Sequence, residues 1–158
     1  MLLVMASLSF SFISLIRLVL SPDFSASFFP TTNLSLRSAV SYTIGDNLSG
    51  NEPLSKIPPL RGAISLNYDL PDYWFLTSIE FSLPQKRLSS NDISDSRIGE
   101  GGTAGYTVLD VRGGYKFAGW GDFVLSIENV FDKLYKIHGS GIYSSGRNFI
   151  LSLNIDFK

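Results

Sequence analysis

The chain closes with GRNFILSLNIDFK, residues 146–158, in which every second residue is apolar. The apolar positions are Phe149, Leu151, Leu153, Ile155 and Phe157. Because successive side chains of a strand point to opposite faces, this alternation predicts one strand with a dry face and a polar face. A soluble sheet and the closing strand of a membrane barrel both use such a strand, so the rest of the sequence must decide between them.

The composition favours a large surface that is not charged. Of the 158 residues, 44% are hydrophobic and 13% aromatic, and the 17% that are charged fall below the roughly 25% usual for soluble domains. The formal net charge of -1 gives no basic surface for nucleic acid. The absence of cysteine excludes disulfides, thiolate metal sites and a cysteine nucleophile.

The same period of two recurs in five further segments. They are residues 33–45, 62–70, 73–83, 106–117 and 122–130. With residues 146–158 they give about six strands of roughly 9 to 12 residues, which is the length of a tilted bilayer crossing rather than the 5 or 6 of a soluble sheet. No helical period follows residue 30.

The connections between these strands alternate in length. Long segments (residues 46–61, 84–105 and 131–146) alternate with very short ones at residues 71–72 and 118–121. Outer-membrane barrels have this asymmetry, with short periplasmic turns and long extracellular loops. The sequence therefore predicts an all-β, antiparallel, up-and-down transmembrane barrel segment.

Charge and aromatic residues fit this interpretation. The channel-facing candidates, all on the polar faces, are Arg37, Glu80, Asp110, Arg112 and Glu128. Several of them carry opposite charges on adjacent strands, which predicts cross-strand pairing that fixes the register, with contribution to a substrate path as the alternative. Aromatic residues at strand ends suit the membrane interfaces, and these are Tyr42, Tyr68, Tyr73, Tyr115, Phe117, Trp120 and Phe157.

Six strands do not close a barrel, because spanning barrels begin at about eight strands and an open edge in lipid leaves backbone groups unpaired. The chain is therefore expected to be part of a larger barrel, an oligomeric barrel or a truncated reading frame.

Residues 1–30 differ from the rest and form a separate unit in this interpretation, with the barrel segment at residues 31–158. The apolar run from Leu2 to Leu20 contains Arg17 and several serines. It is compatible with a signal peptide, a membrane helix, a strand remnant or a misplaced start.

Four segments in order resemble the C-terminal barrel of TonB-dependent outer-membrane receptors. They are EPLSKIPPLRGAISLNY (52–68), GYTVLDVRGGYKF (105–117), IENVFDKLYKIHGSG (127–141) and GRNFILSLNIDF (146–157). The resemblance covers about residues 33–158 and implies roughly 22 strands around a plug domain. It also implies TonB-dependent uptake of a scarce nutrient such as a siderophore, haem or cobalamin. Neither a plug nor an energising motif is recognised in the sequence, so the chain alone is expected to be inactive.

The same resemblance implies the cell outer membrane as the location. The implied partners are membrane lipid, the remaining strands and plug of the parent barrel, the barrel assembly machinery and, through the parent receptor, the TonB complex. Two rival interpretations stay open: a small porin-like barrel completed by self-association, and a soluble β-rich adhesin or binding domain.

No enzyme, metal site or cofactor is predicted. The single histidine, His138, cannot build a metal site and is expected to be a solvated loop residue. No pair of acids and no Ser-His-Asp set is singled out by its spacing. The candidates for ligand contact lie in the long loops and are Lys86, Arg87, Arg97, Tyr135 and Tyr143.

Overall fold

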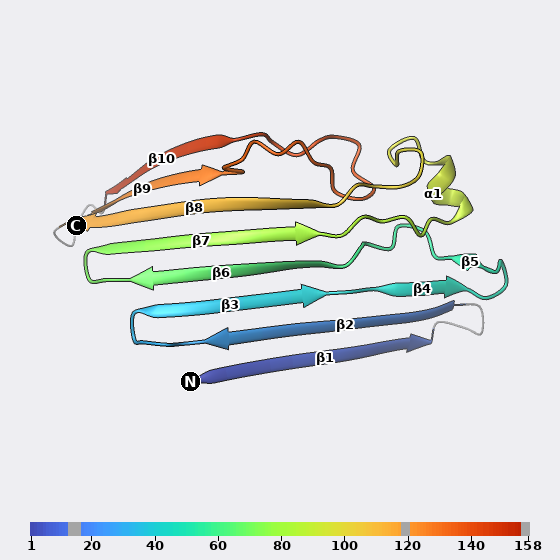
Figure 1. Cartoon of the computed structure of the whole chain (residues 1–158), viewed down its shortest axis with the longest axis horizontal. Coiled ribbons are helices and arrows are strands. Elements are labelled where there is room, and N and C mark those ends of the chain that lie inside the picture. Colours follow the sequence, from blue (N-terminus) through green and yellow to red (C-terminus); the bar gives the residue numbers. More distant parts are fainter. Residues whose placement is uncertain (13–16, 118–120, 156–158) are drawn as a thin grey trace.

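The computed structural model describes residues 1–12, 17–117 and 121–155, and almost all of the secondary structure in them is one antiparallel sheet (Figure 1). The strands are β1 (Leu2–Phe12), β2 (Arg17–Phe28), β3 (Leu34–Ser41), β4 (Ile44–Asn47), β5 (Glu52–Pro53), β6 (Arg61–Asp69), β7 (Tyr73–Ser82), β8 (Tyr106–Phe117), β9 (Gly121–Glu128) and β10 (Asn148–Ile155). The sheet order is β10-β9-β8-β7-β6-β3-β2-β4-β5, and β1 pairs with β2. The all-β antiparallel prediction is confirmed.

β3 and β4 lie on one continuous line along β2. β2 pairs with β3 up to Asp23↔Ser41 and with β4 from Leu20↔Ile44, without a change of register. Between these pairs lies Pro22, which has no N–H to donate to the ladder and only accepts a bond from the Tyr42 N–H at 3.2 Å. The proline therefore accounts for the interruption between the two strands.

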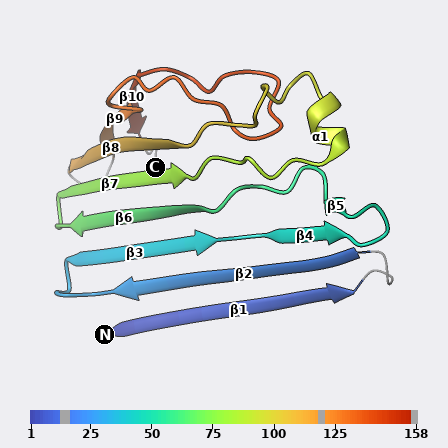
Figure 2. The same cartoon turned by 45° about the vertical axis from the view of Figure 1, so that its right-hand side comes forward.

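The long and short connections lie at opposite ends of the sheet (Figures 1 and 2). Residues 29–33 and 70–72 form tight connections at one end, which we call the turn rim. Residues 48–60, 83–105 and 129–147 extend from the other end, and we call these three loops the loop crown. The predicted alternation of loop lengths is thus seen as a segregation in space.

One face of the sheet carries large apolar side chains, and no second layer of the described residues covers them. Leu36, Ile64, Phe75, Ile79 and Leu125 are 37%, 44%, 43%, 42% and 45% exposed. The described apolar residues that are buried are few (Ile98, Tyr106 and Val108). A sheet of this size with an uncovered apolar face needs a partner layer or lipid.

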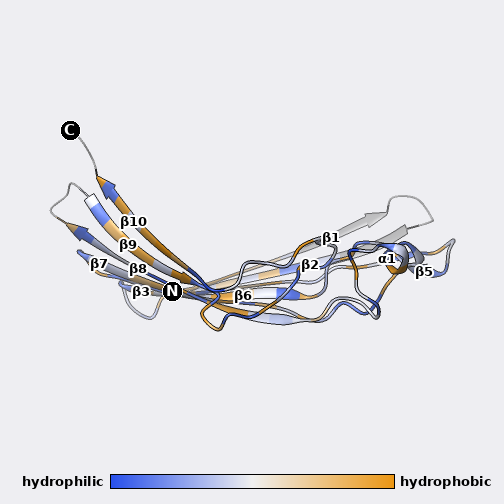
Figure 3. Ribbon diagram, turned by 90° about the horizontal axis from the view of Figure 1, so that it is seen from above, coloured by the Kyte–Doolittle hydropathy of each residue, from blue (hydrophilic) through white to orange (hydrophobic). Residues whose placement is uncertain are grey.

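The sheet is curved but not closed. Viewed from above, β9 and β10 turn out of the plane of the other strands (Figure 3). Within the part of the chain that the structure describes, β1 pairs only with β2 and β10 only with β9. Both outer edges are consequently open, in agreement with the incomplete barrel that the strand number predicts.

The structure adds detail to the sequence interpretation in two places. Residues 2–12 and 17–28 form strands of the same sheet as the rest of the chain. Of the interpretations left open for residues 1–30, the structure agrees with the strand. The loop crown holds the short strands β4 and β5 and a five-residue helix, α1 (Ser90–Ser94). No helix of the described residues is long and apolar enough to cross a membrane.

Candidate functional site: the polar face and the loop crown

The five predicted channel-facing residues lie on one face of the sheet. The register pairs Ala63 with Glu80 and Ser78 with Asp110, so Glu80 and Asp110 project from the same side of β7 and β8. Arg112 pairs with Ser126, which places it beside Glu128 on that side, and Arg37 follows through its pairing with Ser65. The register thus gathers the five side chains on a common surface, which we call the polar face.

The prediction that these charges pair across strands is wrong. The Arg112 Nε–H donates to Ser126 Oγ at 2.8 Å, and Glu80 accepts a bond from the Tyr106 hydroxyl at 3.1 Å. Asp110 accepts the backbone N–H of Asn129 at 2.8 Å. Neutral hydroxyl and amide donors sit nearer to the acids than the guanidinium does, so the backbone ladder, rather than ion pairs, sets the register.

The polar face contains a hollow of about 560 Å³ that spans β1, β2, β3, β6 and β7. Small side chains, among them Ser25, Ala39 and Ala63, lie beneath it, and Asp23, Arg61, Glu80 and Met5 are among its other lining residues. The hollow exists because the side chains of these small residues are too short to fill the space above the sheet. The hollow is large enough to take a segment of another domain or a small molecule.

Aromatic residues mark the two ends of the opposite, apolar face. Tyr68, Tyr73, Tyr115 and Phe117 lie near the turn rim, and the Tyr73 and Tyr115 ring centroids are 4.8 Å apart. Tyr42 lies at the opposite end, next to the loop crown. Two further aromatic positions predicted for the interface, Trp120 and Phe157, lie outside the described residues.

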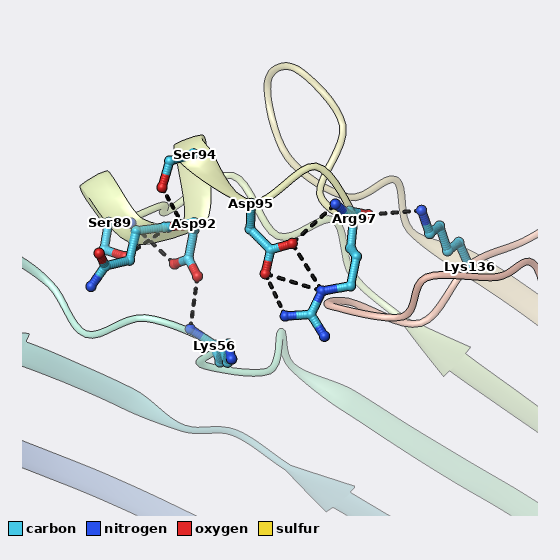
Figure 4. Close-up of polar contacts among 8 residues, drawn as sticks. Lys56, Ser89, Asp92, Ser94, Asp95, Arg97 and Lys136 are labelled. Atoms are coloured by element: carbon cyan, nitrogen blue, oxygen red, sulfur yellow. Dashed lines mark hydrogen bonds and ion pairs between the residues drawn. The ribbon is translucent and has the colours of Figure 1, made fainter.

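A buried carboxylate joins the first two loops of the crown. Asp92 is 2% exposed and accepts the Lys56 N–H at 2.9 Å and the Ser89 N–H at 3.1 Å (Figure 4). Glu52 accepts the Ser90 N–H at 2.8 Å, and this bond lowers the pKa of the Glu52 carboxyl below its usual value. The side-chain amide of Gln85 donates to the Ile57 carbonyl at 2.8 Å. Residues 48–60 are thus held to residues 83–105 by three side chains.

Sequence reasoning missed these tethers, although one signal was present. Ser89 and Asp92 form a capping box at the start of α1, in which each side chain accepts the backbone N–H of the other residue. The Ser-x-x-Asp spacing identifies such a helix start even when the helix is too short to show a hydrophobic period. The contribution of Gln85 and Glu52 has no comparable local signature, because their partners are 28 and 38 residues away.

The NVFDK segment (residues 129–133) organises the third loop. The Asn129 side chain donates to the Lys133 carbonyl at 2.9 Å and the Ser145 carbonyl at 3.1 Å, and its oxygen accepts the Lys133 N–H at 2.8 Å. Asp132 accepts the Arg147 N–H at 2.8 Å. Asn129 and Asp132 both have positive φ, 48° and 54°, a conformation that these residue types tolerate. The motif closes the loop on itself and is structural in this chain.

His138 is not the solvated loop residue that was expected. Its Nδ1 lies 2.8 Å from Thr103 Oγ1, and its Nε2 is buried without a partner among the described residues. Burial lowers the pKa of the imidazole, against the opposing influence of Asp92 and Asp95. His138 therefore links residues 129–147 to residues 83–105, and the Lys136 ammonium strengthens this link by donating to the Arg97 carbonyl at 2.7 Å.

The predicted ligand-contact residues of the loops differ in how far they are engaged. Arg87 forms an ion pair with Asp46, and Arg97 pairs with Asp95, whose carboxyl pKa is held well below its usual range by this arginine. The Tyr135 ring packs at a tilt against the Tyr106 ring, with a centroid distance of 4.3 Å, and the centroid of the Tyr143 ring lies 5.7 Å from the Lys136 ammonium. Lys86 is exposed.

Comparisons with known proteins agree with the geometry. The family model for the TonB dependent receptor-like β-barrel matches residues 9–130. Among solved structures, the copper transporter OprC is similar with a TM-score of 0.75 and 22% identity over 89% of this chain and 24% of its own. The ferric-catecholate import receptor Fiu of E. coli K12 has a TM-score of 0.65 and 22% identity over 88% of this chain and 21% of its own. No curated protein matches by sequence.

Proposed function

Since the chain belongs to the TonB-dependent receptor β-barrel family, as the sequence resemblance predicted, we propose that it forms part of the wall of an outer-membrane receptor for a scarce nutrient. The nutrient classes proposed are siderophores, haem and cobalamin. The chain covers 24% and 21% of the similar transporter and receptor, so uptake is proposed for the whole receptor and not for these strands alone.

The observation that carries the proposal is the division of side chains between the two faces. Glu80, Asp110 and Arg112 project from one face of β7 and β8, and Phe75 and Ile79 lie uncovered on the other. A membrane barrel needs this division, because its outer face meets hydrocarbon and its inner face meets water. In this proposal the polar face lines the channel, and the apolar face contacts lipid.

The aromatic residues support a specific placement in the bilayer. Tyr73, the first residue of β7, and Leu83, the residue after its end, mark the two ends of the apolar stretch and are ten residues apart. At about 3.3 Å per residue and a tilt of about 40°, this stretch spans about 25 Å across the membrane, the height of the apolar band of outer-membrane barrels. The tyrosines at the turn rim then lie at the periplasmic interface, and the loop crown is extracellular.

This placement assigns partners to the remaining surfaces. The open edges of β1 and β10 pair with further strands of the barrel, since unpaired backbone groups are costly in lipid. The hollow over Ala39 and Ala63 faces the lumen, where the plug of the receptor lies. We further propose that β10 is the strand that the barrel assembly machinery recognises, and that the TonB complex acts on the chain only through the whole receptor.

Two measurements on the source cells test the proposal. An antibody against residues 84–105 should detect the protein in the outer-membrane fraction, released only by detergent. Deleting the gene should abolish energised uptake of one labelled nutrient among a ferric siderophore, haem and cobalamin. Detection in the soluble fraction contradicts the proposal and favours an adhesin. A detergent-dependent oligomer that conducts ions without an energy source favours the porin-like alternative.

A further inference from the structure

A second pocket lies on the outside of the sheet, where the apolar face meets the loop crown. Its volume is about 270 Å³. Its lining comes from β3–β4 and from two loops of the crown, and consists of Tyr42, Thr43, Ile44, Pro53, Ile57, Pro59, Leu60, Leu83, Pro84, Gln85, Lys86 and Arg87. We call it the rim pocket.

The floor of the rim pocket continues the apolar face. The register aligns Val40, Gly62 and Phe81 in one row across β3, β6 and β7. Two residues further along each strand, the next row on the same face is Tyr42, Leu60 and Leu83, and the Leu83 N–H donates to the Leu60 carbonyl at 2.9 Å. Tyr42 and Leu83 are 39% and 51% exposed. The floor is therefore apolar and accessible from the lipid side.

The charged residues that line the rim pocket are both cations. The Arg87 guanidinium donates a hydrogen bond to the Gly45 carbonyl at 3.0 Å and forms an ion pair with Asp46. These bonds fix its position beside the pocket and leave its Nε–H without a partner among the described residues. Lys86 is exposed and has no ion-pair partner in the described part of the chain. An apolar floor below two cations is complementary to an anionic headgroup that carries an acyl chain.

We propose that the rim pocket binds the phosphate of an acylated membrane lipid, with Lys86 as its main cationic contact and Tyr42 and Leu83 against the first carbons of the chain. This inference rests on the proposed function, because it requires the loop crown to lie at the outer membrane surface. The volume of about 270 Å³ is below the range of about 300–1,000 Å³ for whole small ligands, so the pocket holds the headgroup end of the lipid while the chain follows the apolar face.

Native mass spectrometry of the detergent-purified protein that carries this chain tests the proposal. The probes are dioleoyl phosphatidic acid, dioleoyl phosphatidylcholine and inorganic phosphate. We expect phosphatidic acid to be retained in preference to phosphatidylcholine, and Lys86→Gln to weaken its binding about tenfold, since a charge-assisted contact of this kind is lost. The matched control is Lys116→Gln, which removes the same charge from the polar face near the turn rim and should leave lipid binding unchanged.

Each other outcome overturns the inference. Equal binding of the two lipids, or equal effects of Lys86→Gln and Lys116→Gln, shows that the cations of the rim pocket do not select the lipid. Displacement of phosphatidic acid by inorganic phosphate shows a site for the anion alone. Failure of the proposed function is seen separately, because the wild-type protein would then remain in solution without detergent, whatever lipid it binds.

Discussion

A lysine in the middle of the apolar face should destabilise the protein far more than a lysine on the adjacent polar position. Ile79 lies in β7, six residues from Tyr73 and four from Leu83. With the rise and tilt used above, its side chain lies about 15 Å and about 10 Å from the two ends of the apolar band, close to the membrane midplane. Its neighbour Ser78 projects to the polar face, opposite Asp110.

The expected magnitudes differ widely. A lysine on the lipid face near the midplane costs about 2–4 kcal/mol. Because each 1.4 kcal/mol is a factor of ten, Ile79→Lys should raise the unfolding equilibrium constant roughly 30- to 700-fold. Ser78→Lys places its ammonium opposite a carboxylate, an arrangement worth about 0.2–1 kcal/mol in favour of the fold.

The assay is guanidinium unfolding of the protein that carries this chain, refolded into phosphatidylcholine bilayers and followed by heat-modified electrophoretic mobility. The two variants change the same charge on adjacent residues, so differences in expression or net charge do not separate them. The reasoning is refuted if Ser78→Lys destabilises the protein as much as Ile79→Lys does, or if Ile79→Lys leaves the unfolding midpoint unchanged.

Three further predictions concern the loop crown. Asp92→Ala should leave the backbone N–H groups of buried Ser89 and exposed Lys56 without their acceptor and destabilise the crown locally by about 1–3 kcal/mol, seen as faster hydrogen exchange in residues 83–105, whereas unchanged exchange would contradict it. Gly102→Ala should destabilise the loop more than Gly101→Ala does. Both glycines have positive φ (105° and 81°), but only at Gly102 would a Cβ lie 2.0 Å from the Gln85 carbonyl oxygen. Limited proteolysis compares the two variants, and equal protease sensitivity would count against this prediction. His138 binds protons less readily in the folded state than in the unfolded state, so its contribution to the contact between the loops should be complete above its ordinary pKa of about 6.5 and diminish as the pH falls toward the lowered folded pKa. Hydrogen exchange in the loop crown should therefore become faster between pH 7.5 and pH 5. If the same pH-dependent loosening persists in His138→Asn, the assignment to His138 is refuted.

The sheet was largely predictable because its determinants are local and repeated. The alternation in residues 62–70, 73–83 and 106–117 places the strands within one or two residues of β6, β7 and β8, and it also separates the polar face from the apolar face. Loop length alone predicts that the long connections share a rim. Both properties follow from the period of two and from strand count, which the sequence displays directly.

The N-terminal strands and the polar contacts were harder to predict. Arg17 and Pro22 interrupt the apolar pattern of β2, and its pairing with β1, β3 and β4 shows that it is a strand. The matched family region also begins at residue 9, whereas the resemblance seen in the sequence begins near residue 33. Cross-strand ion pairs were expected from charge signs, but the partner of Arg112 depends on side-chain geometry that no spacing encodes. Burial of His138 likewise depends on a loop 35 residues away.

The most direct test of membrane insertion uses cysteines introduced one at a time at residues 74–82, since the chain has no cysteine of its own. Each would carry a spin label in the bilayer-inserted protein, and its collision rates with oxygen and with an aqueous nickel chelate would be measured. The membrane-wall interpretation predicts a period of two, with oxygen favoured at Phe75, Thr77, Ile79 and Phe81 and the nickel chelate favoured between them. Labels that all favour the nickel chelate, or that show no alternation, would contradict it.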